Sequence, residues 1–396
     1  MRGRKNLTLE EKVKRFIPSK LVNITVWNTC ECNLACKYCY VFKLHPNQPR
    51  RYMDKKTADA VIEFAKKSLS EGGTIWFFGG EPLMRKEIIK YIVERCVSEG
   101  LRFHFGFTTN ATLLDEEFIE YMKKYRMSIL ISLDGPKEKH DKYRVFKDGR
   151  GSWDIVFRNL QNLRRLYIEQ PQIRWTFAPE TLPGLADDIK KFVEEYRLYN
   201  IAVDPVFECD WDESDYKRLR EEMLRLRNYV LKWYSRGLRV WLKPVRDGIE
   251  LLKSLYSGRR QWESRCGLAQ GSIGVDINGD IFPCHRFVEF HKEREELILG
   301  NVFEGFDMKK RIQWIKNWLM FPPVSENKEL CRHCIHKPAC HGGCIAINYD
   351  LFGDVHIVPE TVCRINQIID EVFLPVGIWL YHYAPEIYNI FVRTRL

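Results

Sequence analysis

Between residues 20 and 236, short runs of apolar, β-branched and aromatic residues alternate with longer segments in which apolar residues recur every three or four positions. The short runs are typical of buried parallel strands, and the longer recurrence is typical of helices with one apolar face. Six strands are predicted, at residues 22–27, 74–78, 102–108, 128–134, 173–178 and 201–207.

The segments between these strands carry helix signals. Helices are predicted at residues 54–73, 85–100 and 115–125, and residues 214–236 form a further, outer helix with a charged face. Asp54 and Asp115 stand where N-cap residues accept backbone hydrogen bonds, and the first two helices end at glycine. Strands that alternate with helices predict a parallel sheet with right-handed crossovers, either doubly wound or closed into a partial barrel.

Small and polar residues follow four successive predicted strands. In parallel α/β folds the chemistry lies at the carboxyl ends of the strands, which share one edge of the sheet. We therefore expect the following segments to form the site: the cysteine-rich segment 29–40, Gly79-Gly80-Glu81-Pro82, Thr108-Thr109-Asn110 and Ser132-Leu133-Asp134-Gly135-Pro136.

The segment after the first strand holds four of the 13 cysteines. Cys32, Cys36 and Cys39 have the spacing C-x3-C-x2-C, which suits three thiolate ligands of one iron–sulfur cluster and leaves one iron open. A structural zinc site is the alternative, and it would need a fourth protein ligand. Cys30 is available for that, although its place at a strand end favours packing.

These motifs together resemble the radical S-adenosylmethionine (radical SAM) enzymes. The resemblance rests on CNLACKYCY at residues 32–40, GGEPL at 79–83, TTNATLL at 108–114 and SLDGP at 132–136. It implies an α/β fold, a partial (β/α)6 TIM-like barrel. In that family the open iron chelates the methionine part of SAM, and reduction of the cluster cleaves SAM to a 5′-deoxyadenosyl radical that abstracts hydrogen from the substrate.

The resemblance also implies which residues contact SAM. Gly79 and Gly80 would let the backbone approach the amino group, with Glu81 as a buried acceptor and Pro82 stiffening the turn. Backbone near two tyrosines would contact adenine, and two polar residues would contact ribose and carboxylate. An arginine would pair with the SAM carboxylate or else lie on the surface. These further residues are Tyr38, Tyr40, Asn110, Ser132 and Arg144.

Seven more cysteines lie between residues 266 and 363. The stretch SIGVDINGDIFPC predicts a β-hairpin with Asn278-Gly279 as a two-residue turn and Cys284 at the end of its second strand. Loops with C-x2-C spacing commonly bind zinc, so a pair of zinc sites is one interpretation.

The spacing of the seven resembles the SPASM extension of radical SAM enzymes, which holds two auxiliary [4Fe–4S] clusters. Carried over, Cys266, Cys284 and Cys344 would bind the first auxiliary cluster, and Cys331, Cys334, Cys340 and Cys363 the second. The resemblance thus implies three [4Fe–4S] clusters in all. Some family members have an eighth cysteine where this chain has Arg260, so either the first auxiliary cluster keeps an open iron or a remote group such as Cys209 fills it.

The predicted domains follow the same division. Residues 1–20 form an extension, 21–240 the radical SAM domain, 241–265 a linker, 266–364 the SPASM domain and 365–396 an aromatic helical tail. The tail either docks on the barrel or lines a substrate cleft. Because only some 20 residues precede the first strand, we expect no N-terminal leader-binding module. Cys96 lies on an apolar helix face and is expected in the core, and Cys209 is expected to be a structural thiol.

Composition and charge exclude several classes. The 396 residues, 45% hydrophobic with Phe 23, Tyr 18 and Trp 11, exclude a disordered chain. No apolar run long enough to span a membrane and no signal peptide is present, so a cytoplasmic protein without membrane attachment is predicted. The net charge is +10, and the basic residues are spread along the chain. The sequence contains no recognisable nucleic-acid-binding module.

The predicted function is peptide maturation: hydrogen abstraction from a ribosomally made precursor peptide, forming a thioether, carbon–carbon or cyclopropane-type ring, with flavodoxin or ferredoxin as reductant. His285 follows Cys284 where sulfatase-maturing members carry a carboxylate, so it is a candidate base or else a loop histidine. The alternatives are anaerobic sulfatase maturation to formylglycine and, in another class, a non-enzymatic iron–sulfur electron carrier.

Overall fold

The computed structural model describes residues 13, 17–41, 52–257, 269–288, 295–320, 323–334, 337, 340 and 342–393. The chain divides into two compact units. The first comprises Met1–Ala35, Cys39–Ile129 and Ser264–Pro322, and the second comprises Cys36–Tyr38, Leu130–Glu263 and Pro323–Leu396. The chain passes from the first unit to the second inside strand β4 (Ser128–Ser132).

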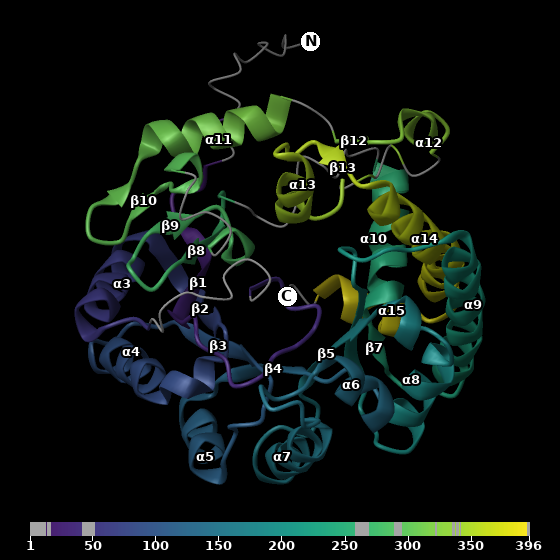
Figure 1. Cartoon of the computed structure of the whole chain (residues 1–396), viewed down its shortest axis with the longest axis horizontal. Helices are drawn as coiled ribbons and strands as arrows, with labels where there is room; N and C mark the ends of the chain where they lie inside the picture. Colours follow the sequence, from purple (N-terminus) through teal and green to yellow (C-terminus); the bar gives the residue numbers. More distant parts are fainter. Residues whose placement is uncertain are drawn as a thin grey trace. The chain divides into compact units, whose positions relative to one another are not determined.

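The first unit is a mostly parallel sheet with helices against it (Figure 1). Its strands run in the order β9-β8-β1-β2-β3, and only the β8–β9 pair is antiparallel in this sheet. The strands are β1 (Leu21–Thr29), β2 (Leu69–Gly79), β3 (His104–Thr109), β8 (Ser272–Val275) and β9 (Ile281–Phe282), with the short pair β10 (Gly300–Asn301) and β11 (Gly305–Phe306). The helices are α3 (Lys55–Ser68), α4 (Lys86–Ser98), α5 (Glu116–Tyr125) and α11 (Met308–Met320), with short 3-10 turns η1 (Pro82–Arg85), η4 (His285–Phe287) and η5 (Glu295–Leu297).

The second unit continues the alternation of strands and helices. Its parallel strands run in the order β4-β5-β6-β7. They are β5 (Gln172–Phe177), β6 (Asn200–Pro205) and β7 (Trp241–Leu242), and a separate parallel pair is β12 (Val324–Ser325) with β13 (Ile357–Val358). The helices are α6 (Lys137–Tyr143), α7 (Trp153–Leu166), α8 (Leu185–Glu194), α9 (Glu213–Ser235), α10 (Lys243–Ser257), α12 (Lys328–Arg332), α13 (Ile345–Phe352), α14 (Glu360–Tyr383) and α15 (Pro385–Arg393), with the 3-10 turn η2 (Pro179–Thr181).

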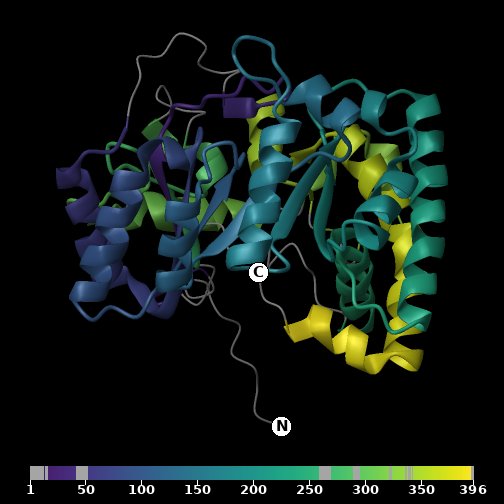
Figure 2. The ribbon, with the colours of Figure 1, turned by 90° about the horizontal axis from the view of Figure 1, so that it is seen from below.

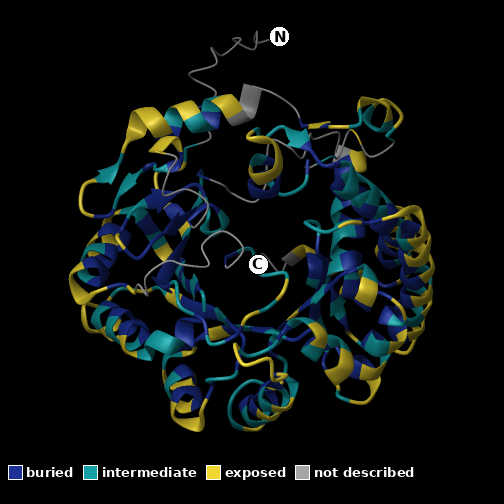
Figure 3. Ribbon diagram, in the orientation of Figure 1, coloured by how far each residue is buried: buried dark blue, intermediate teal, exposed yellow. Residues whose placement is uncertain are grey.

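All six predicted strands are present, and their parallel pairing within each unit confirms the predicted α/β class. The predicted N-caps are also confirmed, because the Asp54 carboxylate accepts from Thr57 N at 2.7 Å and the Asp115 carboxylate from Phe118 N at 2.9 Å. Many strand side chains are buried where the helices pack on the sheet. In Figure 3 the strands are mostly dark blue, and the outer faces of the helices carry the exposed, yellow residues.

Two local predictions are wrong. The helix predicted at 54–73 ends at Ser68, because the buried Leu69 pairs with Leu21 and already belongs to β2. The β8–β9 hairpin is present, but its loop spans residues 276–280 and is not the two-residue turn expected. The Asp276 carboxylate holds this longer loop by accepting from the backbone N–H groups of Asn278 and Asp280, each at 2.8 Å.

The long helix α14 packs against α10 and α9 within the second unit (Figure 2). Gly248 on α10 faces α14 so closely that an added Cβ would lie 2.5 Å from the Phe373 carbonyl oxygen. The absence of a side chain therefore lets the two helices approach each other. Phe373 and Leu380 of α14 are fully buried, so this part of the aromatic tail packs in the core.

Among the described residues, no helix has the length and apolarity needed to cross a membrane.

Candidate functional site

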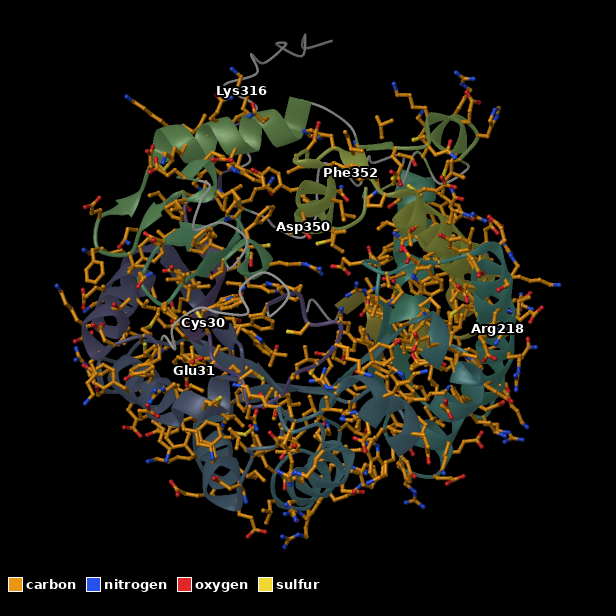
Figure 4. All side chains as sticks on the ribbon, in the orientation of Figure 1. Cys30, Glu31, Arg218, Lys316, Asp350 and Phe352 are labelled. Carbon is orange, nitrogen blue, oxygen red and sulfur yellow. The ribbon has the colours of Figure 1, made fainter. Side chains whose placement is uncertain are left out.

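In the first unit, the turn after β2 lies directly against the loop after β1. Gly80 N donates to Thr29 O at 3.0 Å, and Glu81 N donates to Glu31 O at 2.7 Å. An added Cβ would lie 2.0 Å from Thr29 O at Gly79 and 2.2 Å from Glu31 O at Gly80, and Gly79 has φ +134°. Both glycines are required by this close approach, which holds the cysteine loop that carries Cys30 and Glu31 (Figure 4).

Glu81 is a buried carboxylate that ties two loop segments together. It is 1% exposed. One oxygen accepts from Leu83 N at 3.0 Å and from the Thr109 hydroxyl at 2.7 Å, and the other accepts from Asn110 N at 2.7 Å. The carboxylate thus fixes the end of β3 against the turn after β2, and Pro82 begins the 3-10 turn that follows.

Asn110 connects this brace to the first cluster cysteine. Its amide nitrogen donates to Asn33 Oδ1 at 3.0 Å and lies 3.6 Å from Cys32 Sγ. Leu34 N also donates to Cys32 Sγ, at 3.4 Å. A sulfur that receives two N–H groups is suited to the thiolate state, which is the form that binds iron.

The donor set fits an iron–sulfur cluster in its chemistry. Cys32 and Cys39 belong to the first unit and Cys36 to the second. Across the described part of the chain, no three His, Cys, Asp or Glu side chains converge as a ready metal site. Cys32, with its two hydrogen-bond donors, is the ligand for which the surroundings are best defined.

In the second unit, Tyr38 and Arg144 meet on a buried aspartate. Arg144 Nη1 donates to Tyr38 Oη at 2.7 Å, and Tyr38 Oη donates to Asp134 Oδ2. Arg144 is 8% exposed and Asp134 4% exposed. Burial raises the pKa of Asp134, while the Arg144 guanidinium, 3.8 Å away, opposes that rise. Arg144 is therefore no surface arginine, and its buried Nε has no hydrogen-bond partner among the described residues.

His140 and Ser152 fix the backbone around this pair. His140 Nδ1 accepts from Asp134 N at 3.1 Å, and its Nε2 lies 2.9 Å from Ser152 Oγ, which donates to Arg144 O at 2.8 Å. Burial, together with the Arg144 charge, holds the pKa of His140 well below its usual range. The imidazole is neutral, and Nε2–H is its donor to Ser152.

The remaining predicted SAM contacts are placed as follows. Ser132 ends β4, half-buried, and pairs with Arg174 of β5 in the second unit. Tyr40 follows Cys39 in the first unit, where the Arg286 guanidinium lies 4.5 Å from the centre of its ring.

His285 lies on an aromatic surface of the first unit. Its ring centre is 4.8 Å from that of Phe78, which in turn lies 5.7 Å from Trp27. The preceding residue, Cys284, caps the short turn η4 that carries His285. The candidate base is therefore next to a predicted cluster ligand and above the carboxyl end of β2.

Four predicted ligands belong to the second unit. Burial raises the pKa of the Cys363 thiol to about 12; Cys340, Cys331 and Cys334 contribute to this rise, and Ser325 opposes it. Cys344, predicted to bind the other auxiliary cluster, stands at the N-cap of α13.

The other cysteines have separate surroundings. Cys266 and Arg260 lie outside the described residues. Cys96 is fully buried, as predicted for a core thiol, and burial raises its pKa to about 12. Cys209 Sγ donates to Val206 O at 3.4 Å.

Sequence reasoning missed several residues that hold the site. Asp134 and His140 lie in motifs singled out for other reasons, SLDGP and HDKYR, and their burial was the missing information. Sequence reasoning also missed Gln367, whose amide donates to Cys334 Sγ, because no motif marks it. Predicted cysteine ligands and a buried carboxylate brace at the ends of parallel strands are typical of a cofactor-binding α/β enzyme.

Comparison with known proteins gives the family. The sequence model of the radical SAM superfamily matches residues 29–195 of this chain. The chain belongs to the radical SAM superfamily of enzymes.

Its relatives have different functions. The chain is 35% identical to an uncharacterized protein of Archaeoglobus fulgidus over 366 residues, covering 88% of this chain and 80% of that one. It is 24% identical over 336 residues to a cysteine-type anaerobic sulfatase-maturating enzyme of Clostridium novyi, covering 79% of this chain and 84% of that one. It is 22% identical over 373 residues to the radical SAM cyclopropyl synthase TigE of Paramaledivibacter caminithermalis, covering 88% and 73%.

A solved structure shares the fold. Native anSMEcpe with bound AdoMet and Cp18Cys peptide aligns with a TM-score of 0.73 at 20% identity, covering 93% of this chain and 99% of that one.

Proposed function

We propose that this protein is a radical SAM peptide maturase that abstracts hydrogen from a ribosomally made peptide and forms a ring or crosslink in it. The observation that carries the proposal is His285, which stands beside Cys284 on the Phe78 ring where sulfatase-maturing members place a carboxylate. Relatives of both kinds, a cyclopropyl synthase and sulfatase maturases, support peptide or protein substrates in general.

SAM and a [4Fe–4S] cluster held by Cys32, Cys36 and Cys39 would supply the radical chemistry when bound. The chain's residues would position the cosubstrate. The turn Gly79-Gly80-Glu81-Pro82 sets the loop geometry, Asn110 supports Cys32, and Arg144 binds the SAM carboxylate. Ser132, Tyr38 and Tyr40 complete the proposed contacts.

The second group of cysteines would hold two auxiliary [4Fe–4S] clusters in a SPASM domain. Cys331, Cys334, Cys340 and Cys363, which all belong to the second unit, would hold one of them. Cys266, Cys284 and Cys344 would hold the other cluster. After hydrogen abstraction the substrate must lose one proton and one electron. His285 would take the proton, the auxiliary clusters would take the electron, and a flavodoxin or ferredoxin would supply the electron that starts the reaction.

Sulfatase maturation is the second candidate, favoured by the similarity to the Clostridium novyi enzyme. The two functions differ in product. Crosslinking removes two hydrogen atoms from the peptide and forms no aldehyde, whereas formylglycine is an aldehyde.

The test is anaerobic turnover of the reconstituted protein with SAM, dithionite and one of two peptides: a precursor peptide encoded beside the gene, or a cysteine peptide from a sulfatase. With the precursor peptide we expect 5′-deoxyadenosine, consumption of the peptide and a product that has lost two hydrogen atoms. We expect no such product from the sulfatase peptide. An aldehyde that reacts with a hydrazide probe on the sulfatase peptide would replace this proposal with sulfatase maturation. Absence of 5′-deoxyadenosine under every condition would contradict both.

Replacing Arg144 by lysine is expected to weaken SAM binding about 30-fold, roughly 2 kcal/mol, because a lysine cannot make the two-point contact with a carboxylate that a guanidinium makes. The measurement is SAM affinity by equilibrium dialysis of the reconstituted protein. Arg150→Lys is the matched control, since Arg150 is exposed and pairs with Asp148. Equal SAM affinity in Arg144→Lys and Arg150→Lys would remove Arg144 from the SAM site.

A further inference from the structure

Helix α14 carries a predicted ligand and an amide donor one turn apart. Cys363 and Gln367 are four residues apart on this helix and therefore lie on the same face. The Gln367 amide nitrogen donates to Cys334 Sγ, and the two atoms are 3.0 Å apart. An N–H group at this distance from a sulfur is a close contact, and it joins residues 33 positions apart in the sequence.

Two other groups belong to the same part of the chain. The hydroxyl of Ser325, which is 3% exposed, lowers the pKa of the Cys363 thiol, against the larger rise that burial causes. Asn327 N donates to Ser325 Oγ at 3.2 Å, so the hydroxyl hydrogen is available to the thiol. Gly342 N donates to Cys340 Sγ at 3.2 Å.

The polypeptide around Ser325 holds its hydroxyl in place. Ser325 pairs with Val358 in the short parallel pair β12–β13, and α14 begins two residues after Val358. Ser325 and Cys363 thus lie on adjoining segments, the first on β12 and the second on the helix that follows β13. The Gln367–Cys334 contact joins α14 to the segment that follows α12.

We propose that Gln367 is a positioning residue that raises the reduction potential of the cluster bound by Cys331, Cys334, Cys340 and Cys363. This inference rests on the proposed function, which assigns these cysteines to an auxiliary [4Fe–4S] cluster. Reduction adds one negative charge to the cluster and its thiolates, and hydrogen bonds to the sulfurs stabilise that added charge. With the Gln367 amide present, this cluster would accept the electron that leaves the substrate more readily than it would without that donor.

The test is an anaerobic redox titration of the full-length reconstituted protein, followed by electron paramagnetic resonance. Cys334→Ala identifies the signal that belongs to this cluster. Gln367→Leu removes the donor, and we expect the equilibrium constant for one-electron reduction to fall about tenfold, which lowers the midpoint potential by about 59 mV. Gln367→Glu keeps the shape of the side chain and adds a negative charge, so its potential is expected to fall further.

Asn366→Leu is the matched control, because it removes a neighbouring half-buried amide from α14. Its potential is expected to equal that of the unmodified protein. Equal potentials in Gln367→Leu and Asn366→Leu, with full iron content in both, would overturn the inference. A different result concerns the proposed function: if Cys334→Ala keeps its full iron content and every signal, these cysteines do not bind a cluster, whatever Gln367 does.

Discussion

A Cys32→Ser variant is expected to form no 5′-deoxyadenosine and to bind about four fewer iron atoms per chain than the unmodified protein. Cys32 Sγ lies where Leu34 N and the Asn110 amide stabilise a thiolate. A serine hydroxyl at this position stays protonated near neutral pH and is a poor ligand for iron. The measurements are iron and sulfide content after anaerobic reconstitution, and 5′-deoxyadenosine by chromatography after adding SAM and dithionite.

Cys30→Ser is the matched control for this prediction. Cys30 is in the same loop, half-buried and two residues before Cys32, but outside the C-x3-C-x2-C spacing. It is expected to retain iron and 5′-deoxyadenosine formation. If Cys30→Ser loses four irons and Cys32→Ser does not, the assignment of the ligands within this loop is wrong.

Replacing Glu81 by alanine is expected to lower the free energy of unfolding by about 3 kcal/mol, since three donors lose their acceptor in a buried place and each unsatisfied group costs roughly 1–3 kcal/mol. The donors are Leu83 N, Asn110 N and the Thr109 hydroxyl. Urea denaturation of the full-length chain, followed by circular dichroism, measures the effect.

The conservative and control variants separate the role of the carboxylate from that of the side chain's bulk. Glu81→Gln keeps one oxygen but sets an amide nitrogen against a donor, so a loss of about 1–2 kcal/mol is expected. Glu87→Ala should change stability by less than about 0.5 kcal/mol, because its side chain is 60% exposed and pairs only with Arg85. A Glu81→Ala protein as stable as Glu87→Ala would show that the carboxylate does not hold the loops.

The strands could be predicted because their apolar residues indicate that they are buried. Ile24, Val26, Ile75 and Phe77 are fully buried, and a parallel sheet covered by helices requires such residues in continuous runs. The boundary at Leu69 was not predictable in this way. Its apolar side chain fits the helical recurrence of the preceding residues, and only its pairing with Leu21, distant in sequence, assigns it to a strand.

The site shows the same division. Spacing and glycine content identified the cysteine loop and the turn at residues 79–82, because these features are local in the sequence. The function of Glu81 differs from the expectation of an acceptor near a cation, since its oxygens accept from the protein's own Leu83, Thr109 and Asn110. Contacts such as Gln367 with Cys334 depend on how separate segments pack, and no spacing rule records them.

Helix α14 has a consequence for the order in which this protein is made. The packing of Gly248 against Phe373, and the burial of Phe373 and Leu380, come from polypeptide alone. The turn that carries Cys363 and Gln367 therefore belongs to a helix that protein contacts hold in place. On the proposed function, cluster assembly at this end of the chain would be a late step on a folded scaffold, so iron supply would limit the amount of active enzyme and leave the yield of folded chain unchanged.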